Sequence, residues 1–299
     1  MALSQINVMY GHLEGTVTKF ARDPSGYLTI ETGIFARHGL NVSWELVQGT
    51  EERYDRLEKG AAHISLVVGR ASLQHFLRSR ATNILGCAMN SCPYYLLVDP
   101  SIHGWPDLKG KIIACREGPA RNTPLSGTLA NTARLDLGRD LTLALPQSDL
   151  DAFNALVSGR VQGALLPRPY GFLAEEKGFK RISDWPDVVD DPLPITIETT
   201  AKLLKERGRD FEAFLAAHRE GIRYMKGERA KTIQMLQDRF HHTPAFATKT
   251  FDEYLVCMNE RLVVDFRKLQ QLLSQIAPGE MAGVRQIAAD WVMAGALSE

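Results

Sequence analysis

The sequence lacks several features that would place a protein in a specialised class. Its 299 residues include only four cysteines, which is too few for a disulfide scaffold, and no two of them have the spacing of a zinc knuckle. Acidic and basic residues number 35 each, so no basic excess favours nucleic acid as a partner. No apolar run approaches the about 18 residues that a membrane-spanning helix needs. We therefore expect a globular protein with no nucleic-acid partner and no membrane span.

Motifs that carry a known chemistry are also missing. The sequence contains no Gly-rich phosphate loop, no Gly-x-Ser-x-Gly elbow and no zinc-binding helix motif. Its first residues have neither the basic start nor the apolar core of a signal peptide. We therefore expect no cofactor and no metal, and a location that is periplasmic if a signal peptide has been removed and cytoplasmic otherwise.

What the sequence does contain is an alternation of strand and helix patterns. Apolar runs and period-two alternation predict strands, and apolar residues at helical spacing predict helices. The first set comprises strands at 6–10, 40–47 and 63–68 and helices at 27–38 and 50–60. The second comprises strands at 84–89, 94–98, 112–115, 141–145 and 161–166 and helices at 125–135 and 150–157. This rhythm predicts parallel sheets with helices on their faces, and from Ile195 onward the spacing predicts a mostly helical tail.

Four short motifs occur in the order in which one protein family carries them. They are TGIFARHGLNV at 32–42, LEKG at 57–60 running into the strand at 63–68, DLKGK at 107–111 and ALVSGRVQGA at 155–164. In these motifs the chain resembles the sulfonate/nitrate/taurine-type solute-binding proteins of ABC transporters, which are related to the thiamine-pyrimidine synthase-like proteins. The motifs indicate architecture and do not identify a ligand.

The resemblance implies a type II periplasmic-binding-protein fold, an α/β architecture with two lobes, a ligand cleft between them and a helical C-terminal tail. Residues 1–95 and 195–299 would form one lobe and residues 99–190 the other, with hinges at 96–98 and 191–194. The implied function is capture of a small organic molecule by closure of the cleft; the residues at the strand ends, considered next, predict that this molecule is anionic. The implied partner is the permease of an ABC-type importer, and we expect the binding protein to be a monomer.

The predicted site follows from the rule that ligands of open parallel sheets bind beyond the carboxyl ends of the strands. The residues at those ends are His12, Glu14, Gly49, Thr50, Arg70, Asn90, Ser91, Cys92, Arg116, Asn122, Thr123, Arg168 and Tyr170. Two of these stretches, Gly49-Thr50 and Asn122-Thr123, lead into predicted helices whose first backbone N–H groups favour anions.

Three of the predicted site residues are arginines, at positions 70, 116 and 168. A guanidinium group offers a planar fork of donors that suits a carboxylate, sulfonate or phosphate, so the ligand is predicted to carry a negative charge. A surface or inter-lobe salt bridge is the alternative role of each arginine. Tyr170 would stack on a planar ligand or pack in the core. His12 and Glu14 have no third ligand with which to hold a metal.

An enzyme on the same fold is the alternative to a binding protein. It would be a cytoplasmic decarboxylase or other small-molecule lyase that acts on an aromatic or heterocyclic acid. Cys92 is the thiol at a predicted strand end that would serve as nucleophile, but no base lies near it in the sequence. We therefore favour a binding protein over an enzyme.

Overall fold

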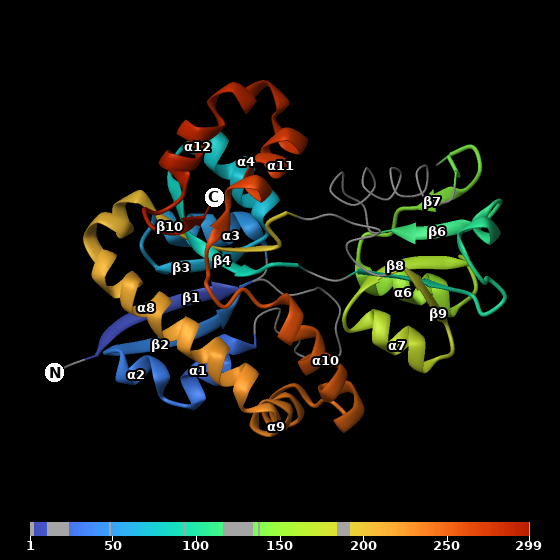
Figure 1. Cartoon of the computed structure of the whole chain (residues 1–299), viewed down its shortest axis with the longest axis horizontal. Coiled ribbons are helices and arrows are strands. Elements are labelled where there is room, and N and C mark those ends of the chain that lie inside the picture. The colour runs from blue at the N-terminus through green and yellow to red at the C-terminus, as the bar shows by residue number, and fades with distance from the viewer. Residues whose placement is uncertain are drawn as a thin grey trace. The chain divides into compact units, whose positions relative to one another are not determined.

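The computed structural model describes residues 3–10, 24–47, 49–91, 94–115, 134–136, 138–183 and 192–298. Within these ranges the chain forms two compact units, and each contains one five-stranded sheet flanked by helices (Figure 1). The first unit draws on 3–10, 24–90 and 192–298, and the second on 91–183. The α/β class predicted from the sequence is confirmed, while the exact lobe bounds and the hinges stay predictions.

The sheet of the first unit has the strand order β2-β1-β3-β10-β4. Its strands are β1 (Ser4–Tyr10), β2 (Leu40–Leu46), β3 (Ile64–Val67), β4 (Thr82–Met89) and β10 (Ile195–Thr200). β1 pairs in parallel with β2 and β3, whereas β10 runs antiparallel to both β3 and β4. The carboxyl ends of β1 to β4 therefore share one edge of the sheet, which we call the first edge.

β10 is a strand that the sequence analysis did not predict at the start of the mostly helical tail. Its sequence, ITIETT, consists of β-branched residues apart from Glu198, and such residues favour strands. All six residues of β10 are buried, because the strand lies inside the sheet between β3 and β4. The helical pattern takes over only after Thr200, whose side chain caps the next helix.

Helices cover both faces of the first sheet (Figure 1). They are α1 (Ser25–Glu31), α2 (Ile34–Arg37), α3 (Thr50–Glu58), α4 (Gly69–Ser79), α8 (Ala201–Gly227), α9 (Arg229–Phe240), α10 (Pro244–Cys257), α11 (Phe266–Ile276) and α12 (Val284–Trp291). A short 3-10 helix, η3 (Pro278–Gly283), and the paired strands β11 (Val264–Asp265) and β12 (Leu297–Ser298) complete the unit. The helical tail predicted from the sequence is thus confirmed from α8 onward.

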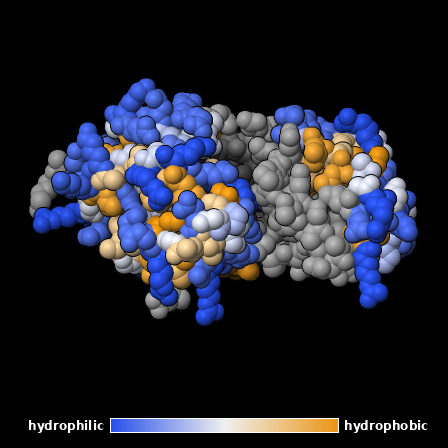
Figure 2. All heavy atoms as spheres, turned by 90° about the horizontal axis from the view of Figure 1, so that it is seen from above, coloured by the Kyte–Doolittle hydropathy of each residue, from blue (hydrophilic) through white to orange (hydrophobic). Residues whose placement is uncertain are grey.

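Side chains alternate between the two faces along β1. Ile6, Val8 and Tyr10 belong to the large core that α1 and α8 cover, whereas Met9 packs with residues of α3. This is the period of two that a strand imposes. Unlike this apolar core, the surface of the first unit seen in Figure 2 is mainly hydrophilic, and its apolar side chains lie in small groups.

The single helix predicted over residues 27–38 is wrong in one respect. The structure divides it into α1 and α2 at Gly33, whose φ of 68° is left-handed. A glycine adopts this conformation at little cost, so the chain can turn there and start a new helix. Ile34 and Phe35 then reach the core from α2.

α1 lies against α8 at an unusually close contact. A β-carbon built on Gly221 of α8 would lie 1.7 Å from the Oγ1 atom of Thr29. On the other side of α1, a β-carbon on Gly26 would lie 2.3 Å from the indole ring of Trp44. Two glycines therefore allow α1 to fit between α8 and β2.

The second unit has the strand order β7-β6-β8-β5-β9. Its elements are β5 (Tyr94–Val98), the 3-10 helix η1 (Trp105–Leu108), β6 (Ile112–Cys115), β7 (Thr142–Ala144), α6 (Asp149–Val157), β8 (Gly163–Pro167), α7 (Tyr170–Glu176) and β9 (Lys180–Ser183). β6, β7 and β8 are parallel, and β5 is antiparallel to β8 and β9. We call the edge with the carboxyl ends of β6, β7 and β8 the second edge.

We predict that Gly221→Ala destabilises the protein. The new methyl group would force α8 away from Thr29, and overpacking of this kind costs about 1–3 kcal/mol. The midpoint of urea unfolding should fall accordingly. Gly208→Ala in the same helix is the control, because a β-carbon there has no neighbour within 4 Å. Equal midpoints for the two variants would contradict the close contact between α1 and α8.

Candidate functional site

α3 begins at the first edge with an N-cap residue that has no side chain to cap the helix. Gly49 is its N-cap residue, with a φ of 81°, and Thr50 is the first helical residue and not the N-cap that its type suggests. The hydroxyl of Thr50 instead accepts a hydrogen bond from Arg53 at 3.3 Å. Uncapped N–H groups at the start of a nine-residue helix favour an anion or water.

α4 begins at the carboxyl end of β3, and its first two residues form hydrogen bonds with distant parts of the chain. The N–H of Gly69 donates to the carbonyl oxygen of Leu193 at 2.9 Å, and a β-carbon on Gly69 would lie 2.3 Å from that oxygen. The guanidinium of Arg70 donates to Gln275 of α11 at 2.8 Å. These contacts support a structural role for Arg70, and its contact with a ligand stays a prediction.

The end of β4 brings in a cation that sequence reasoning missed. Asn90 has an exposed side chain, and its carbonyl oxygen accepts a hydrogen bond from the ammonium group of Lys268 at 2.7 Å. Ser91 follows it and is half-buried. No local pattern connects β4 with a lysine in the first turns of α11, so only the fold could reveal this charge at the first edge.

The second edge holds two of the predicted residues, and both are buried. Arg168 directly follows β8 and is 4% exposed, and Tyr170 begins α7 and is 3% exposed. The ring of Tyr170 packs on Phe153 of α6 at 5.5 Å between centroids. The packing alternative for this ring is therefore realised, although its hydroxyl has no hydrogen-bond partner among the described residues.

The phenol of Tyr170 is held in its neutral form. Burial and the nearby carboxylates of Asp149 and Asp151 raise the pKa of Tyr170 well above its usual value. Asp149 is itself buried at the first position of α6. The second edge thus combines a guanidinium, a carboxylate and a neutral hydroxyl.

The remaining predicted site residues lie outside the described residues. They are His12, Glu14, Cys92, Arg116, Asn122 and Thr123. Their roles stay predictions. Cys87, which precedes Cys92 in the chain, has a buried thiol that donates to the carbonyl oxygens of Met89 and Ile195 at 3.1 and 3.2 Å.

No protein-family model and no curated protein sequence matches the chain. Solved structures do match it. The aliphatic sulphonate-binding protein SsuA of Escherichia coli has a TM-score of 0.72 at 14% identity, covering 96% of this chain and 94% of its own. SsuA of Xanthomonas axonopodis pv. citri, bound to MOPS, has a TM-score of 0.69 at 15% identity, covering 100% and 99%. The nitrate-binding protein NrtA of Synechocystis PCC 6803 has a TM-score of 0.69 at 9% identity, covering 97% and 86%.

The chain has the fold of the periplasmic binding proteins. The strand orders agree with the type II arrangement, because in each unit the fourth strand of the sheet, β10 or β5, runs antiparallel to its neighbours. The resemblance to this family that the four motifs predicted is confirmed for the fold. At identities of 9 to 15%, the neighbours do not establish what this binding-protein fold binds.

Two further findings concern the described residues of this binding-protein fold. None of their helices is long and apolar enough to cross a membrane. They also bring together no group of three or more histidine, cysteine, aspartate or glutamate side chains that could hold a metal ion.

Glu198 is a buried acid that sequence reasoning missed. It lies on β10 under α3 and α4, is fully buried, and accepts a hydrogen bond from the hydroxyl of Ser72. Burial raises the pKa of Glu198 to about 7, although Ser72, Tyr54 and the charge of Arg53 lower it in part. Tyr54 also stacks on His75, with ring centroids 3.6 Å apart.

We predict that Glu198 makes the stability of the protein depend on pH. A carboxyl with a raised pKa binds its proton more tightly in the folded chain, so its contribution is complete below about pH 4.5 and is lost as the pH rises through about 7. Glu198→Gln keeps the neutral form at every pH. Relative to wild type, its free energy of unfolding should therefore rise by about 1–3 kcal/mol between pH 5 and 8.

Urea unfolding at both pH values measures this difference. Glu212→Gln is the matched control, because Glu212 is exposed on α8 and its substitution should change stability equally at the two pH values. A Glu198→Gln variant whose stability follows that of wild type at both pH values would show that Glu198 does not hold the proton.

Proposed function

We propose that this chain captures a small anion for import, as the solute-binding component of an ABC-type transporter. The observation that carries the proposal is the buried guanidinium of Arg168 at the carboxyl edge of a sheet in a binding-protein fold. Ligands of such sheets bind at that edge, and a guanidinium forms two parallel hydrogen bonds with a carboxylate or sulfonate. The three reported neighbours are named for alkanesulfonate, aliphatic sulphonate and nitrate, which are all anions.

The first edge supports the same chemistry with weaker donors. The uncapped start of α3 offers backbone N–H groups, and Lys268 brings an ammonium group to the end of β4. Backbone N–H groups at a helix start carry a partial positive charge that favours anions. An anionic ligand would gain from these groups, whereas a cationic one would not. A periplasmic location and a permease as partner belong to this proposal.

A lyase on the same fold remains the second candidate predicted from the sequence. Its proposed nucleophile, Cys92, lies outside the described residues, so no contact of that thiol supports it. The described cysteines Cys87, Cys115 and Cys257 are buried, and burial disfavours the reactive thiolate. These observations favour the binding protein.

A panel of small anions tests the proposed function. Isothermal titration calorimetry and thermal shift would be run with methanesulfonate, taurine, nitrate, acetate and benzoate. We expect binding of one anion class, with the compound recovered unchanged. At a hundred times its dissociation constant, the anion should stabilise the protein by about 2.7 kcal/mol. If the compound is consumed, the chain is an enzyme, and if no anion binds, the proposal is wrong.

We predict that Arg168→Ala weakens binding of the anion that the panel identifies. Loss of a charge-assisted hydrogen bond costs about 1.5–3 kcal/mol, which is about a 10- to 150-fold rise in the dissociation constant. Arg168→Lys should lose less, because it keeps the charge but not the planar fork. Calorimetry measures the affinity, and thermal unfolding without ligand shows whether each variant folds.

Arg160→Ala is the matched control for this series. Arg160 lies in the same unit but is exposed, and its guanidinium contacts only the nearby Ser158 among the contacts that the structure shows. Its removal should leave affinity unchanged. A folded Arg168→Ala variant that binds as tightly as the Arg160→Ala variant would remove Arg168 from the site.

A further inference from the structure

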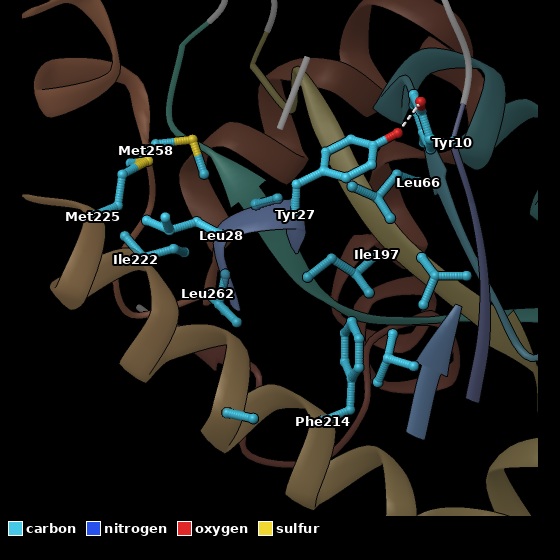
Figure 3. Close-up of a cluster of buried hydrophobic side chains, with 14 of the residues drawn as sticks. Tyr10, Tyr27, Leu28, Leu66, Ile197, Phe214, Ile222, Met225, Met258 and Leu262 are labelled. Atoms are coloured by element: carbon cyan, nitrogen blue, oxygen red, sulfur yellow. Dashed lines mark hydrogen bonds between the residues drawn. The ribbon is translucent and has the colours of Figure 1, made fainter. Parts of the chain in front are cut away.

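Two tyrosines meet at the carboxyl end of β1. Tyr10 is the last residue of the strand and Tyr27 the third residue of α1, and their hydroxyl groups form a hydrogen bond (Figure 3). The rings are nearly perpendicular, at 86°, with centroids 5.9 Å apart. Both side chains are about nine-tenths buried, with 9% and 8% of their surface exposed. Figure 3 shows the two hydroxyls directed toward one another above the apolar core.

The pair has one hydrogen more than it uses. Each hydroxyl carries a single hydrogen, and in a bond between two hydroxyls only one hydrogen is shared. The second hydroxyl therefore still has a hydrogen that it can donate to another acceptor. No residue that the structure describes is seen to accept it, and Arg239, whose guanidinium lies over the Tyr27 ring, can only donate. A buried donor without an acceptor costs about 1–3 kcal/mol, so this position favours an additional acceptor.

A cation beside the pair would stabilise a negatively charged acceptor. Burial raises the pKa of both Tyr10 and Tyr27, so the two phenols stay protonated and remain donors. The guanidinium of Arg239 lies 4.0 Å from the centroid of the Tyr27 ring and lowers the pKa of both phenols in part. Its positive field makes the hydroxyls stronger donors. Its own partner, Glu31, holds it in place at 2.6 Å.

Packing fixes where the hydroxyls lie. The ring of Tyr27 packs edge-on against Phe240 at 5.6 Å, and Trp44 lies within 6.4 Å of both tyrosine rings. Tyr10 ends β1, so the pair lies at the first edge, where ligands of such sheets bind. An ordered donor at this edge would select the position of an acceptor atom as well as its charge.

We propose that the Tyr10–Tyr27 pair donates its remaining O–H to an oxygen atom of the bound anion, so that the first edge is specific for oxyanions. This inference rests on the proposed function, because it assigns a residue pair and a ligand class to the capture of the anion. The sulfonate, carboxylate and nitrate groups share the accepting oxygen. One hydroxyl contacts the anion, and the other orients and polarises it.

The test is a set of three variants, Tyr10→Phe, Tyr27→Phe and the double variant, titrated with methanesulfonate, acetate and sodium nitrate by calorimetry. The variant that removes the hydroxyl in contact with the anion should bind about tenfold more weakly. The other single variant should lose less, because the remaining hydroxyl still has a hydrogen to donate. The double variant should lose no more affinity than the single variant that binds the anion more weakly, since the two hydroxyls act as a unit.

Tyr224→Phe is the control, because Tyr224 lies on α8 in the same unit, is half-buried and faces Lys231. A tyrosine difference spectrum on titration with methanesulfonate gives a second readout, which should be present in wild type and absent in the double variant. If wild type binds and the folded double variant binds as tightly, the pair is only structural and this inference fails alone. If wild type binds neither these anions nor any other anion of the panel, the proposed function fails with it.

Discussion

The sheet of the first unit is continuous only because β10 joins β3 to β4. β3 and β4 follow one another in the sequence with α4 between them, but they do not pair, and the strand between them comes from more than a hundred residues later. β10 therefore sets the distance between the carboxyl ends of β3 and β4 at the first edge. It also carries Glu198 into the interior and leads directly into α8, which covers the core.

The second sheet likewise depends on one strand that joins two others, but here the joining strand comes earlier in the sequence than its neighbours. β5 joins β8 to β9 and runs antiparallel to both, although it precedes them in the sequence. Each sheet thus contains one strand that comes from the far side of a crossing between the units. β10 follows the second unit in the sequence but pairs in the first sheet, and β5 follows β4 of the first unit but pairs in the second sheet. A local sequence pattern predicts strands and helices but contains no sign of such an exchange.

The elements predicted well are those whose ends a glycine or a cap marks. β6 was predicted with the bounds that the structure has, and α3 ends near Gly60, whose φ is positive. β10 was missed because its β-branched residues precede a long helical stretch, and a charged residue at Glu198 does not suggest a buried strand. Whether such a charge is buried depends on what the distant helices α3 and α4 place over it.

The same limit applies to the candidate site. Strand ends could be read from the sequence, so Arg168, which directly follows β8, and Tyr170, which begins α7, were predicted at the second edge, and their contact with a ligand stays a prediction. Lys268 and the Tyr10–Tyr27 pair depend on contacts between elements separated in the chain, and hydrophobic periodicity assigns Tyr10 and Tyr27 simply to the core. An aromatic ring at a core position can still present its hydroxyl at an edge, because the polar atom lies at the far end of an apolar body.

The two kinds of donor would contribute differently to recognition. A guanidinium such as that of Arg168 attracts any anion, so it contributes more to affinity than to choice. A neutral hydroxyl held by packing stabilises only a ligand whose acceptor atom lies within hydrogen-bond distance. A ligand without that acceptor leaves the buried donor unsatisfied and binds more weakly. Neighbours that share this fold at 9 to 15% identity carry names that include both sulfonate and nitrate, so the fold alone does not choose among anions. Under the proposed function that choice would come from side chains at the strand ends of each unit, and burial, which raises the pKa of Tyr10, Tyr27 and Tyr170, keeps these phenols as neutral donors.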